Sequence, residues 1–236
     1  MQTHPVVLSL GKYPGIFHPV VPFDHAKDRL LALDFTAANK ELTTGILKDT
    51  KQFTQWVNDK LSKAGARYGI GGYDEHRTVY SISKVFDGAP GEEPRRLHLG
   101  IDIWGKPRTP VMAPLDGIVH SFAFNDNYGD YGATIILSHQ LEGDHFYTLY
   151  GHLSLNSIKN LNAGDRLEKG DLFAELGIPA ENGQWPPHLH FQLILDIGGW
   201  SGDYPGVCKF SEKEKWLENS PDPDLILQLN KYIGKQ

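Results

Sequence analysis

The segment Trp185–Leu193, WPPHLHFQL, alternates polar and apolar side chains after its two prolines. In a β-strand successive side chains point to opposite faces, so His188 and His190 share one face. Leu189, Phe191 and Leu193 then point into a core. Two histidines two positions apart above an apolar underside are typical of half of a zinc site. A half-exposed strand that carries imidazoles without any ligand is the alternative.

Two further segments place histidines beside apolar residues. In Arg95–Trp104, RRLHLGIDIW, an extended chain puts His98, Gly100 and Asp102 on one face, with the glycine leaving open space between the imidazole and the carboxylate. In Phe146–Ser154, FYTLYGHLS, a strand runs into a Gly-His pair, which places His152 at a strand end.

The second half of the chain reads as short strands separated by turn signals, with a further strand at Thr78–Ile82. The 25 glycines and 15 prolines favour many turns over a helical bundle. We predict a mainly β fold, an antiparallel sheet, sandwich or barrel with helices at both ends. The expected strands are 117–122, 133–138, 146–150, 166–168, 172–176 and 188–195.

The flanking regions predict helices. Prolines 14, 19 and 22 favour an extended N-terminal arm, and residues 28–47 are expected to be helical. Thr50 is the expected N-cap of a helix that ends at Gly65. Residues from 210 onward return to helical patterning around Trp216 and Leu217. We therefore expect an N-terminal region at 1–66, a β domain at 67–200 and a C-terminal helical tail at 201–236.

Composition excludes several classes of function. A net charge of −6 over 236 residues does not suit a nucleic-acid or anionic-membrane binder. No run approaches the ~20 apolar residues of a membrane helix. The first residues lack the pattern of a signal peptide, so we expect a cytoplasmic location. With Cys208 alone there is no internal disulfide and no all-cysteine zinc site.

The polar residues of the three histidine segments suit a hydrolytic metal centre. Zinc in a hydrolase keeps three protein ligands and an open position, and two histidines with one aspartate meet that need. The two remaining histidines are candidates for proton transfer and for stabilising an oxyanion. The helical HExxH arrangement is absent.

In their order along the chain, these segments resemble the LytM/lysostaphin-type zinc metallopeptidases. The resemblance rests on His98-x-x-x-Asp102, on Tyr150-Gly151-His152-Leu153 and on His188-Leu189-His190, and it covers about residues 95–197. The flanking segments 109–117, 127–139 and 162–171 are similar to the family's pattern as well.

The resemblance implies a LytM-like β domain that hydrolyses peptide bonds, in peptidoglycan or its fragments, with Zn²⁺ as cofactor. It implies that His98, Asp102 and His190 bind the zinc and that His152 and His188 form the catalytic pair. Which of the pair acts as general base stays open. Members of the family usually act outside the cytoplasm.

Three other interpretations accompany this one. A non-catalytic module would close the zinc site with His152 or His188 as a fourth ligand. The hairpin 164–171 also resembles carrier domains that bear biotin or lipoate. Residues 1–66 either restrict access to the site or stabilise the domain as a cap.

Two smaller expectations concern residues outside the motifs. His139 is expected to be structural or to support a ligand from behind. A glycine-rich turn is crowded by polar residues that are expected to be solvated, with the lining of a substrate groove as the alternative: Arg67, Tyr73, Glu75, His76 and Arg77.

Overall fold

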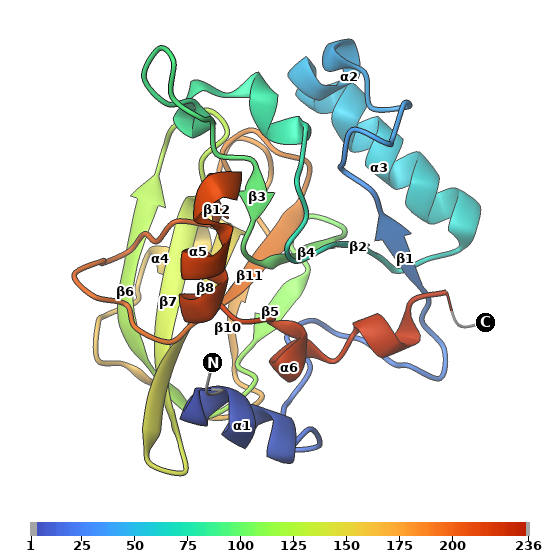
Figure 1. Cartoon of the computed structure of the whole chain (residues 1–236). Coiled ribbons are helices and arrows are strands. Elements are labelled where there is room, and N and C mark those ends of the chain that lie inside the picture. Colours follow the sequence, from blue (N-terminus) through green and yellow to red (C-terminus); the bar gives the residue numbers. More distant parts are fainter. Residues whose placement is uncertain (1–3, 235–236) are drawn as a thin grey trace.

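The computed structural model describes residues 4–234, and an eight-stranded sheet forms its centre (Figure 1). All neighbouring strands in it are antiparallel except β1 and β2, which are parallel. The mainly β fold is therefore confirmed. In sheet order the strands are β1 (Leu30–Leu33), β2 (Tyr68–Gly71), β4 (Ile101–Trp104), β11 (His188–Ile194), β8 (Asp144–Leu153), β7 (Gly132–Leu141), β6 (Gly117–Asn125) and β9 (Arg166–Leu167).

Two small sheets and several helices complete the fold. β5 (Pro110–Met112) pairs with β10 (Leu172–Glu175), and β3 (Leu97–His98) pairs with β12 (Val207–Cys208). The α-helices are α1 (Pro5–Lys12), α2 (Thr44–Lys48), α3 (Thr50–Ala64), α4 (Leu155–Ile158), α5 (Lys213–Asn219) and α6 (Asp224–Leu227). The 3₁₀ turns are η1 (Val79–Ile82), η2 (Lys84–Phe86), η3 (Phe210–Glu212) and η4 (Asn230–Tyr232). No helix among residues 4–234 is long and apolar enough to cross a membrane.

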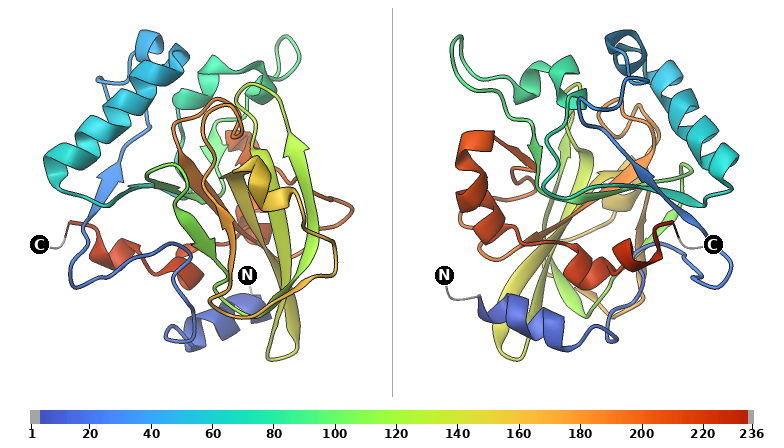
Figure 2. Two further views of the ribbon diagram at one scale, coloured as in Figure 1. Left: turned by 180° about the vertical axis from the view of Figure 1, so that it is seen from behind. Right: turned by 45° about the vertical axis from the view of Figure 1, so that its right-hand side comes forward.

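Helices cover the sheet at different places. α3 lies beside β1 and β2, whereas α1 and α6 lie together at another end of the molecule (Figure 2). Phe53 of α3 packs with Phe35, Trp104 and Trp185 in an aromatic core beside β4. The helix thus buries its apolar side against the strand that carries Asp102.

The strands predicted from alternation are present, with ends that differ by a few residues. The helix predicted to end at Gly65 is also present, and Gly65 adopts the left-handed conformation with φ 59°. Its N-cap is Asp49 rather than Thr50, because the Asp49 carboxylate accepts hydrogen bonds from the backbone N–H groups of Lys51 and Gln52.

Three expectations near the N-terminus were wrong. Residues 5–12 form α1 instead of an extended arm: Pro5 occupies the first turn, where its missing N–H costs nothing, and Val6 and Leu10 are buried. Residues 28–47 contain β1 and only a short helix, because β1 pairs with the distant strand β2. Residues 79–82 form the 3₁₀ turn η1 rather than a strand.

His139, on β7, is buried as a neutral imidazole that serves the fold. Its Nδ1 donates to the carbonyl oxygen of Asp116 (2.8 Å), and its Nε2 lies 2.8 Å from the Thr148 hydroxyl oxygen. Burial lowers the pKa of His139 to about 4. Both hydrogen-bond partners of the ring are uncharged groups, so a protonated imidazole would have no charged hydrogen-bond partner.

This depressed pKa predicts a loss of stability in acid. Above about pH 6.5 the imidazole is neutral in both states, but between about 6.5 and 4 only the unfolded chain takes up the proton. The free energy of unfolding should therefore fall by up to about 3 kcal/mol over this range on account of His139. Urea unfolding at pH 7 and at about pH 4.5 measures the loss, which should be smaller in His139→Gln. Equal losses in the two chains would show that His139 does not contribute.

Candidate metal centre and active-site groove

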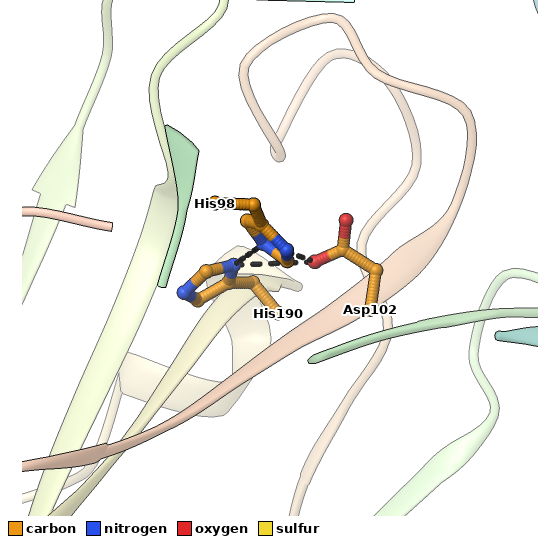
Figure 3. Close-up of side chains that lie close together, drawn as sticks. All are labelled: His98, Asp102 and His190. Atoms are coloured by element: carbon orange, nitrogen blue, oxygen red, sulfur yellow. Dashed lines mark hydrogen bonds and ion pairs between the residues drawn. The ribbon is translucent and has the colours of Figure 1, made fainter. Parts of the chain in front are cut away.

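His98, Asp102 and His190 converge on one point from three strands (Figure 3). Asp102 and His190 are directly opposite each other in the β4–β11 pair, and His98 ends β3. His98 Nε2 lies 2.9 Å from His190 Nδ1, and each of these nitrogens lies 3.2 Å from Asp102 Oδ1. All three side chains are buried.

Gly100 allows the His190 ring to lie against the backbone, whereas the sequence predicts open space beside this glycine. Residues 97–104 form two strands, β3 and β4, rather than one continuous strand. The space above Gly100 is not open, because a Cβ there would lie 2.5 Å from Cε1 of His190. A side chain at position 100 would therefore displace the imidazole.

In both imidazoles, the ring nitrogen on the far side from the converging atoms is hydrogen-bonded. His98 Nδ1 donates to the Gly72 carbonyl oxygen (2.8 Å), and His190 Nε2 donates to Gln192 Oε1 (3.0 Å). The Gln192 amide is oriented by its own donation to Pro205 O and Ser220 Oγ. These partners assign the tautomers, so the inward nitrogens carry lone pairs.

The charges in the centre are consistent with this assignment. Burial, with the nearby Arg77 guanidinium, lowers the pKa of His98 to about 3. Burial alone would raise the pKa of Asp102, but His98 and Arg77 outweigh it and hold that pKa well below its usual value. The neutral His98 imidazole and the Asp102 carboxylate thus face the inward nitrogen of His190 at a single point.

His152 and His188 lie next to this centre and face each other. Their ring centroids are 4.1 Å apart, and His188 is stacked on Trp104 at 3.9 Å. His188 Nδ1 donates to Pro186 O (2.8 Å), and His152 Nδ1 donates to Asn182 O (2.9 Å). Burial lowers the pKa of both, to about 4 for His188. Both rings are neutral bases whose Nε2 is an acceptor.

His152 has an unusual backbone. Its φ of 62° is in the left-handed region, which a non-glycine residue rarely adopts, and its N–H donates to Tyr131 O (2.8 Å). Strained conformations of this kind are concentrated at functional sites.

A groove opens over these residues. Asp102, His152, His188 and His190 line its base. Aromatic residues also line it, among them Tyr80, Tyr131, Trp185, Trp200 and Tyr204. The arrangement places two neutral bases and the three converging side chains at one groove.

All five predicted site residues are therefore neighbours, but His139 is not among them. His139 pairs with Phe146, six positions along β8 from His152, which corresponds to about 20 Å of strand. The residue that sequence reasoning missed is Arg77, expected to be solvated but only 1% exposed. Its hydrogen bond to Asp102 Oδ2 spans 2.5 Å. The charged pair Glu75-x-Arg77 before the first motif was the available signal.

Comparison with known proteins points to the same peptidase family that the three histidine segments resemble. Residues 96–199 match the family model described as peptidase family M23. The chain is 30% identical over 169 residues to an L-Ala--D-Glu endopeptidase of Bacillus subtilis, covering 66% of this chain and 49% of that protein. It is 35% identical over 101 residues to an uncharacterized metalloprotease of Haemophilus influenzae, covering 43% and 19%. The chain thus spans about half of the first relative and a fifth of the second.

Solved structures with detectable similarity include two peptidases. Lysostaphin from Staphylococcus simulans is 27% identical, with a TM-score of 0.43, over 77% of this chain and 55% of that one. A zinc-containing peptidase from Vibrio cholerae is 25% identical, with a TM-score of 0.33, over 42% and 27%. Residues 96–199 of this chain thus match peptidase family M23, in agreement with the resemblance that the ordered motifs carry.

Proposed function

We propose that the protein is a zinc-dependent endopeptidase that hydrolyses peptide bonds in peptidoglycan or its fragments. The proposed metal dependence rests on one observation. Three buried acceptor atoms lie 2.9 to 3.2 Å apart, and none of them has a proton with which to form a hydrogen bond to the others. Lone pairs at this separation repel one another unless a cation lies between them. The family match supports the reaction class.

The donor set fits zinc. Tetrahedral Zn²⁺ with bonds of about 2.05 Å places its ligand atoms about 3.3 Å apart, close to the observed separations. Each imidazole also has an outer partner, as zinc-ligating histidines almost always do. Zinc held there by His98, Asp102 and His190 would supply a Lewis acid that activates water and polarises the peptide carbonyl.

The catalytic pair then handles protons. His152 and His188 donate their Nδ1 protons to backbone carbonyls, so Nε2 of each ring is an acceptor, and both residues line the groove. Being neutral, one ring can accept the proton of the attacking water at Nε2, and the other can stabilise the developing oxyanion or protonate the leaving amine. The stack on Trp104 holds the plane of the His188 ring.

The proposed substrate class rests on the relatives. One of them is named for cleavage between L-Ala and D-Glu. A non-catalytic module, in which His152 or His188 is a fourth zinc ligand, fits the site less well. Among residues 4–234, the only cluster of metal-ligating side chains contains neither of these histidines. A position for water and substrate thus remains beside the three ligands.

A digest of purified peptidoglycan and of soluble muropeptides, read by mass spectrometry with and without a chelator, tests the proposal. We expect new products that vanish with chelator and return with added Zn²⁺, and their masses would identify the bond. If the folded, zinc-loaded chain releases no such product from either substrate, the proposed function is wrong.

A further inference from the structure

Arg77 is a fully buried cation next to one of the three converging side chains. Its Nη1 donates to Asp102 Oδ2 at 2.5 Å and to the Tyr80 hydroxyl at 3.2 Å. Its Nε donates to Glu75 Oε2 at 2.6 Å, and its Nη2 donates to the Gly72 carbonyl oxygen at 3.1 Å. Every nitrogen of the guanidinium thus has a partner.

The surroundings are shaped for this guanidinium. A Cβ at Gly71 would lie 2.7 Å from Arg77 Nη2, so glycine leaves the room that the group occupies. The Phe35 ring lies 5.1 Å from the guanidinium carbon, within the range of a cation–π contact. Burying such a charge is expensive, and a buried ion pair is weak evidence for stabilisation, so a contribution to stability does not by itself explain the arginine.

The two oxygens of Asp102 have separate partners. Oδ2 accepts from Arg77, whereas Oδ1 faces His98 and His190. The hydrogen bond to Arg77 therefore fixes the rotation of the carboxylate and leaves one oxygen for the centre. The Gly72 carbonyl oxygen accepts from both Arg77 and His98, which couples the orientation of two of the three side chains.

We propose that Arg77 is a positioning residue that holds Asp102, and through Gly72 also His98, in the geometry that binds the metal. The inference rests on the proposed zinc site. Arginine is required because its rigid fork reaches Asp102, Glu75 and Gly72 together, which the single ammonium group of lysine cannot do.

Zinc affinity of the metal-free full chain, measured by competition with a chromophoric chelator, tests this role. The variants are Arg77→Lys, which keeps the charge but not the fork, and the double variant Glu75→Gln/Arg77→Met, which removes both members of the buried ion pair. Arg108→Met is the matched control, since Arg108 is an exposed arginine that pairs with Glu175 and Glu181. Circular dichroism and thermal melting verify that each metal-free chain is folded.

We expect both Arg77 variants to bind Zn²⁺ about 10- to 100-fold more weakly than the parent, and Arg108→Met to match the parent. A role through charge alone predicts no such loss, because Arg77→Lys keeps the cation and the double variant removes Glu75 and Arg77 together, which leaves the net charge beside the site unchanged. Parent-like or tighter binding by the folded double variant, or parent-like binding by Arg77→Lys, would overturn the proposal. Failure of the parent itself to bind zinc would instead contradict the proposed function.

Discussion

Replacing His188 with alanine is expected to leave zinc bound while hydrolysis slows by about 10²- to 10⁴-fold, the range that a positioned general acid or base contributes. His188 lies outside the cluster of His98, Asp102 and His190, so its loss removes no ligand. It does remove an Nε2 acceptor beside the centre and the ring that faces His152 at 4.1 Å. The measurement pairs the rate of muropeptide release with the zinc content per chain.

The control for this variant is His145→Ala, which removes an exposed imidazole from β8 at a distance from the groove. That chain should match the parent in both rate and zinc content. Thermal melting shows whether loss of the stack on Trp104 unfolds the His188→Ala chain. Near-parent turnover by a folded His188→Ala chain would remove His188 from the catalytic pair.

The second large effect is expected for His190→Ala, which should lose both zinc and activity. His190 supplies one of the three converging atoms, and its Nε2 proton satisfies Gln192 Oε1. Loss of an outer partner of a metal ligand typically lowers affinity about 10- to 100-fold, and loss of the ligand itself should exceed that. Elemental analysis of the dialysed protein and the chelator-sensitive digest measure the two losses.

A folded His190→Ala chain that retains one zinc per chain after dialysis would contradict the ligand assignment. The metal-free parent and variant should be compared by melting, since the alanine leaves a cavity and an unsatisfied amide oxygen in the core. Equal activity losses in His190→Ala and His188→Ala, with zinc lost only in the former, would separate the two roles.

Much of the site could be predicted because it lies on strands with clear alternation. The polar face of β11 follows from the two-residue period, and the apolar face from Leu189, Phe191 and Leu193, which are all buried. The grouping of the three motifs came from their resemblance to a family, because no local pattern states that Asp102 will lie opposite His190. That pairing is a matter of sheet register.

The features that the sequence did not predict depend on contacts between residues that are far apart in the sequence. Arg77 lies in a glycine-rich stretch that is typical of a solvated turn, and its partner Asp102 is 25 positions away. The four residues of β1, LLAL, have no strand period of their own, and the helix expected over residues 28–47 covers them. The conformation of β1 is determined by parallel pairing with β2, from Leu30 opposite Tyr68 to Leu33 opposite Gly71. Tertiary pairing here overrides local propensity.

The place of β2 between β1 and β4 affects how the chain tolerates shortening. A version cut to the family-matching residues 96–199 would lose β2, and β4 would become an open sheet edge with unpaired N–H and C=O groups. Such an edge is a template for pairing with other chains, so the fragment should be prone to aggregation. It would also lack Arg77 and the Gly72 carbonyl that orients His98. A minimal soluble version of the domain therefore has to include β2 and begin upstream of Tyr68.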